Sequence, residues 1–311
     1  MTEPGPVLVT GTSTGIGRAI VEHLSSNGHA VLAGARTGPD LDALGHLANV
    51  TPLEIDVTRE EKIQRAFEWV RRSDKGLYGL VNCAGIAGFG PMVDTSVEEL
   101  HRILDVNLFG AHRMVQRFYP FLIASHGRIV NISSMGGILT ETFLGTYGIS
   151  KHAVEAYTDL LREELAGLGV GVSAIEPGAF RSELGANYVA SKGPNFASAW
   201  NKSLYRKVIE ALIPQYTGTP EALHRLDLPD PAPVAEAVSE ALFSDSPKPR
   251  YLVAPTKAGA DKVMVQVLTL LDQLNRGQTR PLSKAQLARL FEKTIHPVQP
   301  SRKRASSRRG R

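Results

Sequence analysis

A phenol and an ammonium group at helical spacing are the side chains in this sequence best placed to do chemistry. Tyr147 and Lys151 are four residues apart, and residues at that spacing are neighbours on one face of a helix. A free tyrosine has a pKa of about 10 and is a poor base at neutral pH, but a neighbouring cation favours its phenolate form. The pair therefore indicates a proton-transfer centre, in which Tyr147 takes a proton from a hydroxyl group or returns one to a carbonyl oxygen.

Three other features of the sequence strengthen this interpretation, since an isolated Tyr-x-x-x-Lys is common by chance. Ser134 lies thirteen residues before Tyr147, at the end of an apolar run, and its hydroxyl could orient a substrate oxygen. Asn107 lies in a predicted helix before that run, and Pro177 and Gly178 directly follow the next apolar run. The candidate catalytic residues are therefore Asn107, Ser134, Tyr147 and Lys151.

A glycine-rich turn near the N-terminus indicates a nucleotide site. Gly11, Gly15 and Gly17 follow the apolar run Val7–Thr10 and precede a helical pattern that continues through Leu24. Glycine lets the backbone approach a pyrophosphate closely, and a helix N-terminus offers free N–H groups and a partial positive charge. The alternative is a glycine-rich turn without a ligand.

Short apolar runs that alternate with helical segments predict the elements that position these residues. Such runs indicate βαβ units and a parallel sheet buried on both faces, which is an α/β doubly wound, Rossmann-like three-layer sandwich. We expect one domain over residues 1–300. The predicted strands are Val7–Thr10, Ala30–Ala35, Thr51–Ile55, Gly79–Asn82, Gly127–Ser133, Val170–Glu176 and Arg250–Val253.

The regular alternation breaks after Pro177, and residues 183–231 are predicted to form a helical substrate lid, with a helix over Ala199–Leu212. A helix is expected over Val234–Phe243, and two amphipathic helices around Asp261–Leu274 and Ser283–Glu292. Their apolar stripes favour core or dimer packing, with association at a membrane surface as the alternative. Apolar side chains in and before the lid favour a hydrophobic substrate: Phe180, Leu184, Tyr188, Phe196, Trp200, Leu204 and Tyr205.

Composition excludes several classes of protein. Hydrophobic residues make up 42% of the 311 residues and charged residues 21%, as in an ordinary globular protein. We find no membrane span or signal peptide, and expect a cytoplasmic protein. The single cysteine, Cys83, allows no internal disulfide, and no metal site is predicted.

The net charge of +4 comes from the end of the chain. Residues 301–311 hold six Arg and Lys residues and no acid, and without them the chain has 29 basic and 31 acidic residues. This tail is predicted to be disordered and solvated, with contact to an anionic surface or nucleic acid as the alternative. No nucleic-acid partner is expected.

These motifs resemble the short-chain dehydrogenase/reductase family in their order and spacing. The resemblance covers roughly Val7–Ser182 and, more loosely, Val234–Val253. It includes the G-x-x-x-G-x-G turn, the segment Asn82–Gly85, where Cys83 replaces the more usual asparagine, and the Tyr-x-x-x-Lys pair. The helix that carries Lys151 looks like the branch acting on steroids, retinoids and short hydroxy acids.

The resemblance implies an NAD(P)-dependent oxidoreductase that interconverts a secondary alcohol and a ketone, or a primary alcohol and an aldehyde, by hydride transfer. It also implies that the positive ring of the oxidised cofactor favours phenolate, that Lys151 binds the nicotinamide ribose, and that Asn107 holds a water linking Lys151 to solvent. Ser182 stands where the family commonly has a threonine that bonds the carboxamide. The expected cofactor-binding residues are Gly11, Ser13, Thr14, Gly15, Ile16, Gly17, Arg36, Asp56, Val57, Asn82, Ala84, Gly85, Tyr147, Lys151, Pro177, Gly178, Phe180 and Ser182.

The second predicted strand bears on the choice of cofactor. It ends at Ala35 and Arg36, with no acid to bind both ribose hydroxyls, and a guanidinium can pair with a 2′-phosphate. This favours NADP, with NAD as the alternative. A non-catalytic dinucleotide-binding regulatory protein on the same fold, and an epimerase or dehydratase of the same superfamily, are the other functions considered. The family also implies a homodimer or homotetramer.

Overall fold

The computed structural model describes residues 4–192, 202–209, 211 and 228–295. The chain groups into two compact units, Met1–Met264 and Val265–Arg311. Every candidate site residue lies in the first unit. The single domain expected over residues 1–300 stays a prediction.

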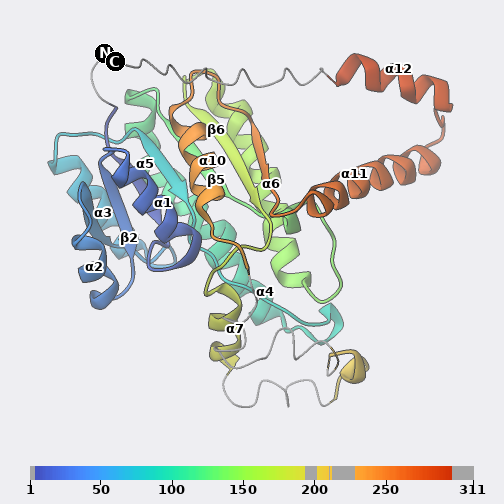
Figure 1. Ribbon diagram of the computed structural model, residues 1–311, viewed down its shortest axis with the longest axis horizontal. Coiled ribbons are helices and arrows are strands. Elements are labelled where there is room, and N and C mark those ends of the chain that lie inside the picture. Colours follow the sequence, from blue (N-terminus) through green and yellow to red (C-terminus); the bar gives the residue numbers. More distant parts are fainter. Residues whose placement is uncertain (1–3, 193–201, 210, 212–227, 296–311) are drawn as a thin grey trace, which may run out of the picture. The chain divides into compact units, whose positions relative to one another are not determined.

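Strands and helices alternate through the first unit as the sequence predicts (Figure 1). The strands are β1 (Val7–Thr10), β2 (Val31–Ala35), β3 (Val50–Glu54), β4 (Gly79–Asn82), β5 (Arg128–Ile132), β6 (Gly171–Pro177) and β7 (Arg250–Val253). The α-helices are α1 (Gly15–Ser26), α2 (Gly38–Gly45), α3 (Glu60–Arg72), α4 (Val97–Leu104), α5 (Gly110–Ala124), α6 (Gly145–Ala166), α7 (Leu184–Lys192), α10 (Ala232–Phe243) and α11 (Lys257–Gly277), which runs on into the second unit. Shorter turns of helix are η1 (Met92–Asp94), η2 (Asp105–Phe109) and η3 (Met135–Gly137).

All seven strands form one parallel sheet in the order β3-β2-β1-β4-β5-β6-β7. From β1 the chain first builds the sheet to one side, with β2 and β3, and then to the other side, with β4 to β7. The strand order therefore reverses between β1 and β4. Ligands of doubly wound sheets bind at this switch point, beyond the carboxyl ends of the strands. The fold therefore places the glycine-rich turn after β1 at the expected nucleotide edge.

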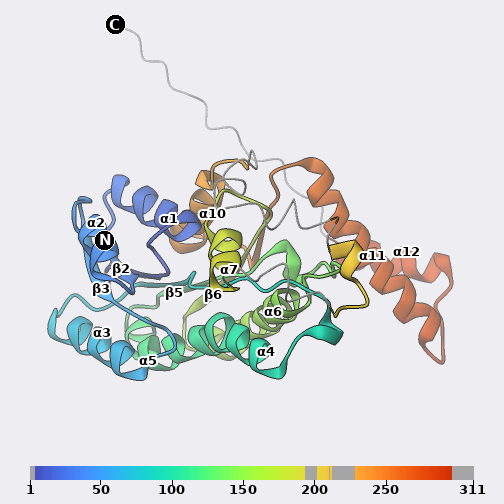
Figure 2. The ribbon, with the colours of Figure 1, turned by 90° about the horizontal axis from the view of Figure 1, so that it is seen from below.

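The central strands are buried on both faces, which explains their continuous apolar sequences. Val7 and Val9 of β1 belong to a core cluster that includes residues of α1, α2 and α10. Leu8, between them, belongs to a second cluster with α3, α5 and α6. The two clusters are the two interfaces of a three-layer sandwich, with α1 and α10 on one side of the sheet and α3, α5 and α6 on the other (Figure 2). The predicted fold class is confirmed.

The predicted strands agree with the observed ones to within one residue at each end. Asn107, predicted to be helical, lies in the π-helical turn η2 between α4 and α5. In the lid, residues 184–192 form α7, and residues 206–209 and 211 are helical. The rest of the helix expected over Ala199–Leu212 lies outside the described residues, as does the basic tail.

The second unit contains the end of α11 and helix α12 (Lys284–Thr294), and both helices are longer than predicted. The side-chain amide of Asn275 closes the turn between them, because it donates to the Leu282 carbonyl at 3.0 Å and accepts from the Leu282 N–H at 2.9 Å. A capping box between Ser283 and Gln286 then starts α12. Among the described residues, no helix is long and apolar enough to cross a bilayer.

Candidate active site

The carboxyl edge of the sheet brings Ser134 and Tyr147 together. Ser134 follows β5 and caps η3, where its Oγ accepts a hydrogen bond from the Gly136 N–H at 3.0 Å. Tyr147 lies in the first turn of α6, and its side chain is hydrogen-bonded to that of Ser134. Ser134 Oγ also donates to the Pro177 carbonyl at 3.4 Å. The hydroxyl and the phenol predicted from sequence thus converge on one point, beside the loop that follows β6.

Lys151 lies one turn further along α6 and is almost fully buried, with 6% of its surface exposed. Its Nζ donates to the Ile132 carbonyl at 2.8 Å and lies 5.7 Å from the centre of the Tyr147 ring. Burial lowers the pKa of Lys151 to about 8, against the opposing influence of Cys83 and Glu155. The ammonium is therefore held in an apolar setting within reach of the phenol.

The acidity of Tyr147 differs from the sequence prediction. Proximity to Lys151 predicts a lowered pKa, whereas burial raises the pKa of the phenol in this structure. The hydrogen bond between Tyr147 and Ser134 offsets only part of that effect, because removing a phenolate from water costs more than one hydrogen bond returns. Tyr147 is thus protonated at neutral pH here, and can donate that proton to a carbonyl oxygen.

Asn107 connects three segments around this centre and is 3% exposed. Its Nδ2 donates to the Ile86 carbonyl at 3.0 Å and to Ser150 Oγ at 2.9 Å, and its Oδ1 accepts from the Ile86 N–H at 2.8 Å. Both amide hydrogens are therefore engaged within the chain, so that Asn107 could hold a water only through an oxygen atom. The predicted role in a proton relay stays a prediction.

The glycine-rich turn has a backbone that only glycine tolerates. Gly11 and Gly15 have φ of +70° and +57°, in the left-handed region. A Cβ on Gly17 would lie 2.1 Å from the Gly11 carbonyl oxygen, and one on Gly11 would lie 2.7 Å from Cα of Ala84. These glycines pack the turn against the start of α1 and the end of β4. Thr14 is exposed, and Ser13 is half-buried.

The N-terminus of α1 fits an anionic group such as a cofactor pyrophosphate. Its N-cap, Thr14, is extended and makes no side-chain capping bond, and the first turn contains no acidic residue, as far as the described chain shows. The first N–H groups of a helix lack partners within the helix, and together with the helix dipole they attract anions. Ile16 packs partly against the core behind this turn. The residues present therefore suit a dinucleotide.

Arg36 and Asp56 lie at the carboxyl ends of β2 and β3, on the same edge. Arg36 is exposed. Asp56 Oδ1 accepts from the N–H and the hydroxyl of Thr58, at 3.0 and 2.7 Å. Burial raises the pKa of Asp56, but these hydrogen bonds and the charges of Arg36 and Lys62 together outweigh burial. The net result is a pKa below the usual value of an aspartate. Asp56 shapes a turn before α3, whose N-cap is Arg59.

Two of the hydrophobic residues predicted to contact the cofactor, Val57 and Phe180, have buried side chains. Val57 is 6% exposed and packs in the core on the α5 side, where a Cβ on Gly110 would meet it at 2.6 Å. Phe180 is 5% exposed and belongs to the core cluster of α1 and α10. Their side chains are therefore taken up by the core, and the predicted contact of each with the cofactor stays a prediction.

The end of β4 is held by a buried polar ladder that explains Asn82. Asn82 Nδ2 donates to Asn131 Oδ1 at 2.8 Å, and Asn131 Nδ2 donates to Thr158 Oγ1 at 2.9 Å, which joins β4, β5 and α6. Burial raises the pKa of Cys83 to about 12, so the thiol stays protonated. This agrees with a packing role for Cys83.

Sequence reasoning missed Thr10 as a site residue. Its Oγ1 accepts from the N–H groups of Cys83 and Ala84, both at 3.1 Å, and so links the carboxyl ends of β1 and β4. The available signal was a lone hydroxyl at the end of an apolar strand, directly before Gly11. A Cβ on Gly85, the next residue, would be 3.8 Å from Lys151 Nζ, so this segment runs beside the candidate catalytic residue Lys151.

The loop after β6 covers both parts of the site. A Cβ on Gly178 would meet Met135 Sδ at 2.9 Å, so the Pro177–Gly178 turn lies against η3, next to Ser134. Ser182, further along, lies at the glycine-rich turn, where a Cβ on Gly15 would be 2.9 Å from Ser182 Cβ. The structure thus puts Ser182 beside the helix N-terminus.

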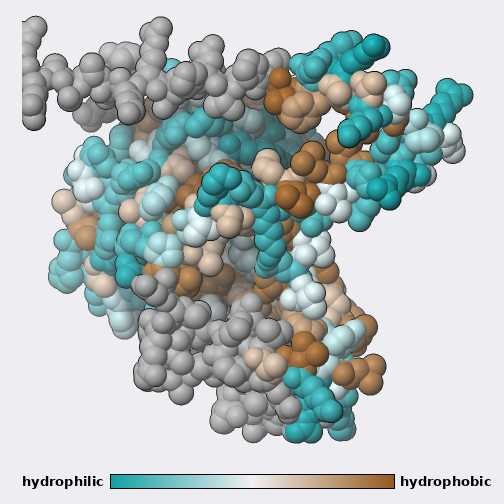
Figure 3. Space-filling model, turned by 45° about the vertical axis from the view of Figure 1, so that its right-hand side comes forward, coloured by the Kyte–Doolittle hydropathy of each residue, from teal (hydrophilic) through white to brown (hydrophobic). Residues whose placement is uncertain are grey.

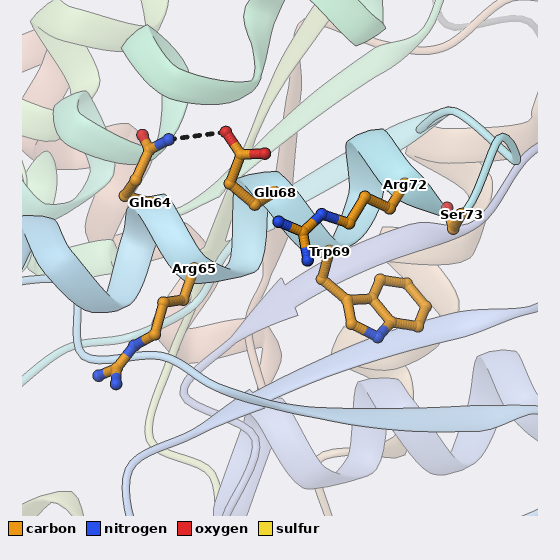
Figure 4. A pocket seen from close by; sticks show the side chains of 6 residues that line it. All are labelled: Gln64, Arg65, Glu68, Trp69, Arg72 and Ser73. Atoms are coloured by element: carbon orange, nitrogen blue, oxygen red, sulfur yellow. Dashed lines mark hydrogen bonds between the residues drawn. The ribbon is translucent and has the colours of Figure 1, made fainter.

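A shallow hollow on α3 is separate from this constellation (Figure 4). Its walls come from one helix and the residue that follows it, and within it Gln64 Nε2 donates to Glu68 Oε1 at 3.0 Å. None of its residues is a candidate site residue: Gln64, Arg65, Glu68, Trp69, Arg72 and Ser73.

Comparison with known proteins identifies the family of this chain. The family described as short chain dehydrogenase matches residues 6–193, which contain the glycine-rich turn, Ser134, Tyr147 and Lys151. This chain belongs to the short-chain dehydrogenase family. A short-chain dehydrogenase is an NAD(P)-dependent oxidoreductase acting on CH–OH groups, and that activity class applies to this chain.

Relatives within the family span several substrates. Mitochondrial D-beta-hydroxybutyrate dehydrogenase of Bos taurus is 34% identical over 79% of this chain and 75% of its own length. Retinol dehydrogenase 16 of Homo sapiens is 33% identical over 79% of each chain. The NADPH-dependent 3-dehydrocapnine reductase of Ornithobacterium rhinotracheale is 34% identical over 80% of this chain and 88% of its own.

Solved structures of short-chain dehydrogenases share the fold. A member from Streptomyces avermitilis superposes with a TM-score of 0.69 at 25% identity, over 95% of this chain and all of that one. Serine dehydrogenase complexed with NADP+ superposes with a TM-score of 0.65 at 26% identity, over 80% of this chain and 94% of that one.

Proposed function

We propose that this short-chain dehydrogenase interconverts a secondary alcohol and a ketone on a lipophilic small molecule, with NADP(H) as cofactor. The observation that carries the proposal is the convergence of Ser134, Tyr147 and Lys151 at the carboxyl edge of the sheet, beside an uncapped helix N-terminus. An acid/base pair without a neighbouring nucleotide site would not support redox chemistry.

Each residue of the centre has a separate task. Ser134 holds the substrate oxygen next to the phenol, and its own position is kept by the Gly136 N–H. Tyr147 gives its proton to a carbonyl oxygen in reduction and takes one from a hydroxyl group in oxidation. Lys151 supplies a buried positive charge near the phenol. The bound nicotinamide cofactor supplies or accepts the hydride.

The choice of NADP rests on Arg36. Its guanidinium follows β2 directly, is exposed, and is close enough to Asp56 to lower the pKa of that carboxyl group. A 2′-phosphate bound at the end of β2 could pair with this guanidinium group. Ala35, by contrast, has no carboxylate to bind the two ribose hydroxyls of NAD. The related structure of serine dehydrogenase with NADP+ supports the same choice.

Replacing Arg36 tests this preference. In Arg36→Ala we expect NADPH affinity to fall roughly 10- to 100-fold, as for the loss of one charged hydrogen bond, while NADH affinity changes little. Titration of cofactor fluorescence measures both. Arg72→Ala, an exposed arginine at the end of α3, is the matched control. Equal losses for the two cofactors would contradict the assignment.

The lipophilic substrate is supported by aromatic side chains around the segments that flank the centre. Tyr188 of α7 packs edge-on against Phe89, with ring centres 5.1 Å apart, and donates to the Phe89 carbonyl at 2.8 Å. Phe143, four residues before Tyr147, packs against Tyr205 with ring centres 5.5 Å apart. Exposed apolar side chains nearby include Met92, Val93, Leu204 and Val208.

The apolar surface at the lower right of Figure 3 corresponds to the part of the molecule where Figure 1 draws residues 202–209 in gold.

The names of two relatives indicate substrates that are small hydroxyl compounds of differing polarity. One relative acts on D-beta-hydroxybutyrate and another on retinol. The lid residues 193–201 and 212–227, with Phe196 and Trp200, lie outside the described residues.

A direct assay separates the possible substrates. Purified protein is incubated with NADPH or NADP+ and a panel of steroids, retinoids, hydroxy acids and simple sugars, and oxidation or reduction of the cofactor is followed by absorbance. We expect turnover with lipophilic alcohols or ketones and a preference for NADP(H). Turnover with sugars alone would overturn the proposed substrate class, and tight cofactor binding without turnover would indicate a regulatory protein.

Assembly as a homo-oligomer is part of the proposal. Helix α6 exposes Ile149 and Leu160, at 43% and 61%, and these residues lie on one face because eleven residues make about three helical turns. Helix α5 exposes Tyr119 at 45%, and η2 just before it exposes Phe109 at 46%. Large apolar side chains at such exposure favour burial in an interface. A cytoplasmic location stays a prediction of the sequence.

Replacing Leu160 tests the interface. We expect Leu160→Asp to convert a dimer or tetramer into smaller species, because a carboxylate would be buried without a partner. Light scattering after size exclusion measures the mass. The exposed Leu168, in the loop after α6, provides Leu168→Asp as a control for surface charge alone. An unchanged mass in Leu160→Asp would rule out this face.

A further inference from the structure

The second unit, Val265–Arg311, exposes apolar side chains on both of its helices. Along α11 they recur three and four residues apart, which places them on one side of the helix. Each is 45–62% exposed: Val267, Leu268, Leu270, Leu271 and Leu274. Contiguous apolar exposure of this kind marks a surface that binds a partner.

Helix α12 has an apolar side of the same kind. Leu287, Leu290 and Phe291 share the spacing of three and four residues, and Leu290 and Phe291 are 49% and 56% exposed. Ile295, directly after the helix, is 54% exposed. The turn that Asn275 closes joins α11 to α12, yet these side chains cover one another only in part (Figure 1). The apolar face of the unit is therefore open to a partner.

Positive charge is concentrated in the same unit. Val265–Arg311 holds 11 Arg and Lys residues and 2 acids, a net charge of +9, whereas Met1–Met264 holds 24 and 29, a net charge of −5. On α12, Lys284 lies three residues before Leu287, and Lys293 lies three residues after Leu290. At this spacing the two lysines border the apolar face of the helix. A partner for this unit must therefore be both apolar and negatively charged.

A lipid bilayer with anionic headgroups has both properties. Pairing with the second unit of another copy would bring +9 against +9, and a nucleic acid would leave the apolar side chains in water. A helix with one apolar and one polar side lies in the plane of a bilayer surface. On α11 the polar side includes Thr269, Gln273 and Arg276, which can stay in water.

We propose that the second unit attaches this enzyme to the surface of a bilayer that contains anionic lipids. The apolar side chains of α11 and α12 enter the boundary between headgroups and acyl chains, and the Arg and Lys residues pair with the negative groups of the lipids. Each contribution alone gives weak, reversible binding, and stable attachment needs both. The inference goes beyond the proposed function and does not depend on it.

Sedimentation with vesicles tests the attachment. Full-length protein is mixed with vesicles of phosphatidylcholine and phosphatidylserine in equal parts, or of phosphatidylcholine alone. We expect binding to the anionic vesicles to be at least roughly tenfold tighter, and to weaken as salt is added, because salt screens the attraction of the Arg and Lys residues. Equal affinity for both kinds of vesicle, or binding to neither, overturns the proposal.

A double leucine variant tests the apolar face. Leu268→Gln combined with Leu274→Gln removes apolar side chains that are 55% and 62% exposed, so the fold should tolerate both changes. We expect affinity for the anionic vesicles to fall roughly 10- to 100-fold, as for the loss of two leucines that the bilayer buries. Leu168→Gln, at an exposed leucine of the first unit, is the matched control and should bind like wild type.

Two results with the double variant overturn the proposal. One is unchanged affinity for the anionic vesicles, since basic charge alone would then account for binding. The other is a lower molecular mass without vesicles, measured by light scattering, because the apolar face would then be a contact between copies of this chain.

Tryptophan fluorescence tests the orientation of α11 without those variants. Leu271→Trp places an indole on the apolar side and Thr269→Trp places one on the opposite side, since two residues turn a helix by about 200°. In anionic vesicles with brominated acyl chains, we expect stronger quenching of Leu271→Trp, after subtraction of the signal from Trp69 and Trp200. Equal quenching overturns the proposal. These measurements need no turnover, so their outcome is separate from that of the proposed function.

Discussion

Tyr147→Phe is expected to lower turnover by roughly 10²- to 10⁴-fold while cofactor affinity changes little, which corresponds to the loss of one general acid. The substitution removes only the phenolic oxygen, and the ring can keep its place at the start of α6 beside Ser134. Steady-state kinetics with NADPH and a ketone substrate measures turnover, and fluorescence titration measures cofactor binding.

A second tyrosine on the same helix supplies the matched control. Tyr157 is also partly buried, and its hydroxyl contacts His112 Nδ1 at 3.2 Å, away from Ser134. Tyr157→Phe should retain near-wild-type turnover. If Tyr147→Phe keeps its activity, the proton-transfer role of Tyr147 is wrong, and if both variants lose it, a general disturbance of α6 is indicated.

Gly17→Ala is expected to have the second large effect, on both stability and cofactor binding. The new Cβ would lie 2.1 Å from the Gly11 carbonyl oxygen and 3.2 Å from Cα of Thr12, so that α1 must move away from the turn. Forced overpacking of this kind costs about 1–3 kcal/mol of folding free energy. A displaced helix N-terminus should also weaken NADPH binding by at least roughly tenfold.

Gly167→Ala is the control for adding a methyl group. Gly167 ends α6, and a Cβ added there would meet no heavy atom within 4 Å apart from those of its own chain neighbours and helix turn. Urea denaturation and fluorescence titration compare the two variants with wild type. A stable Gly17→Ala protein with normal cofactor affinity would show that the close approach of α1 to Gly11 is not required.

Local sequence determined the elements of this protein. Apolar runs such as Val7–Thr10 and Gly79–Asn82 predict their strands to within one residue, because a strand buried on both faces needs apolar side chains at every position. Glycine at positions 11, 15 and 17 predicts the turn, since its positive φ values and close contacts exclude other residues. The Tyr-x-x-x-Lys spacing likewise places two side chains on one helix without further information.

The tertiary structure determined the burial and the pKa of each of those side chains. The raised pKa of Tyr147 and the lowered pKa of Lys151 depend on burial, which arises from segments far away in the sequence. Phe180 and Val57 are buried in the core although their positions suggest ligand contact, because packing on α10 and α5 takes up their surfaces.

The same holds for contacts that join distant segments. Thr10 reaches the N–H groups of Cys83 and Ala84 only because β1 and β4 are neighbours in the sheet. Arg250 meets Glu155 and Glu176 only because β7 joins β6 at the sheet edge. Spacing along the chain determines which groups share one element, but the solvation and the charged neighbours of a group come from other elements. The sequence by itself therefore predicted which side chains react, and the folded chain set their burial and their charged neighbours.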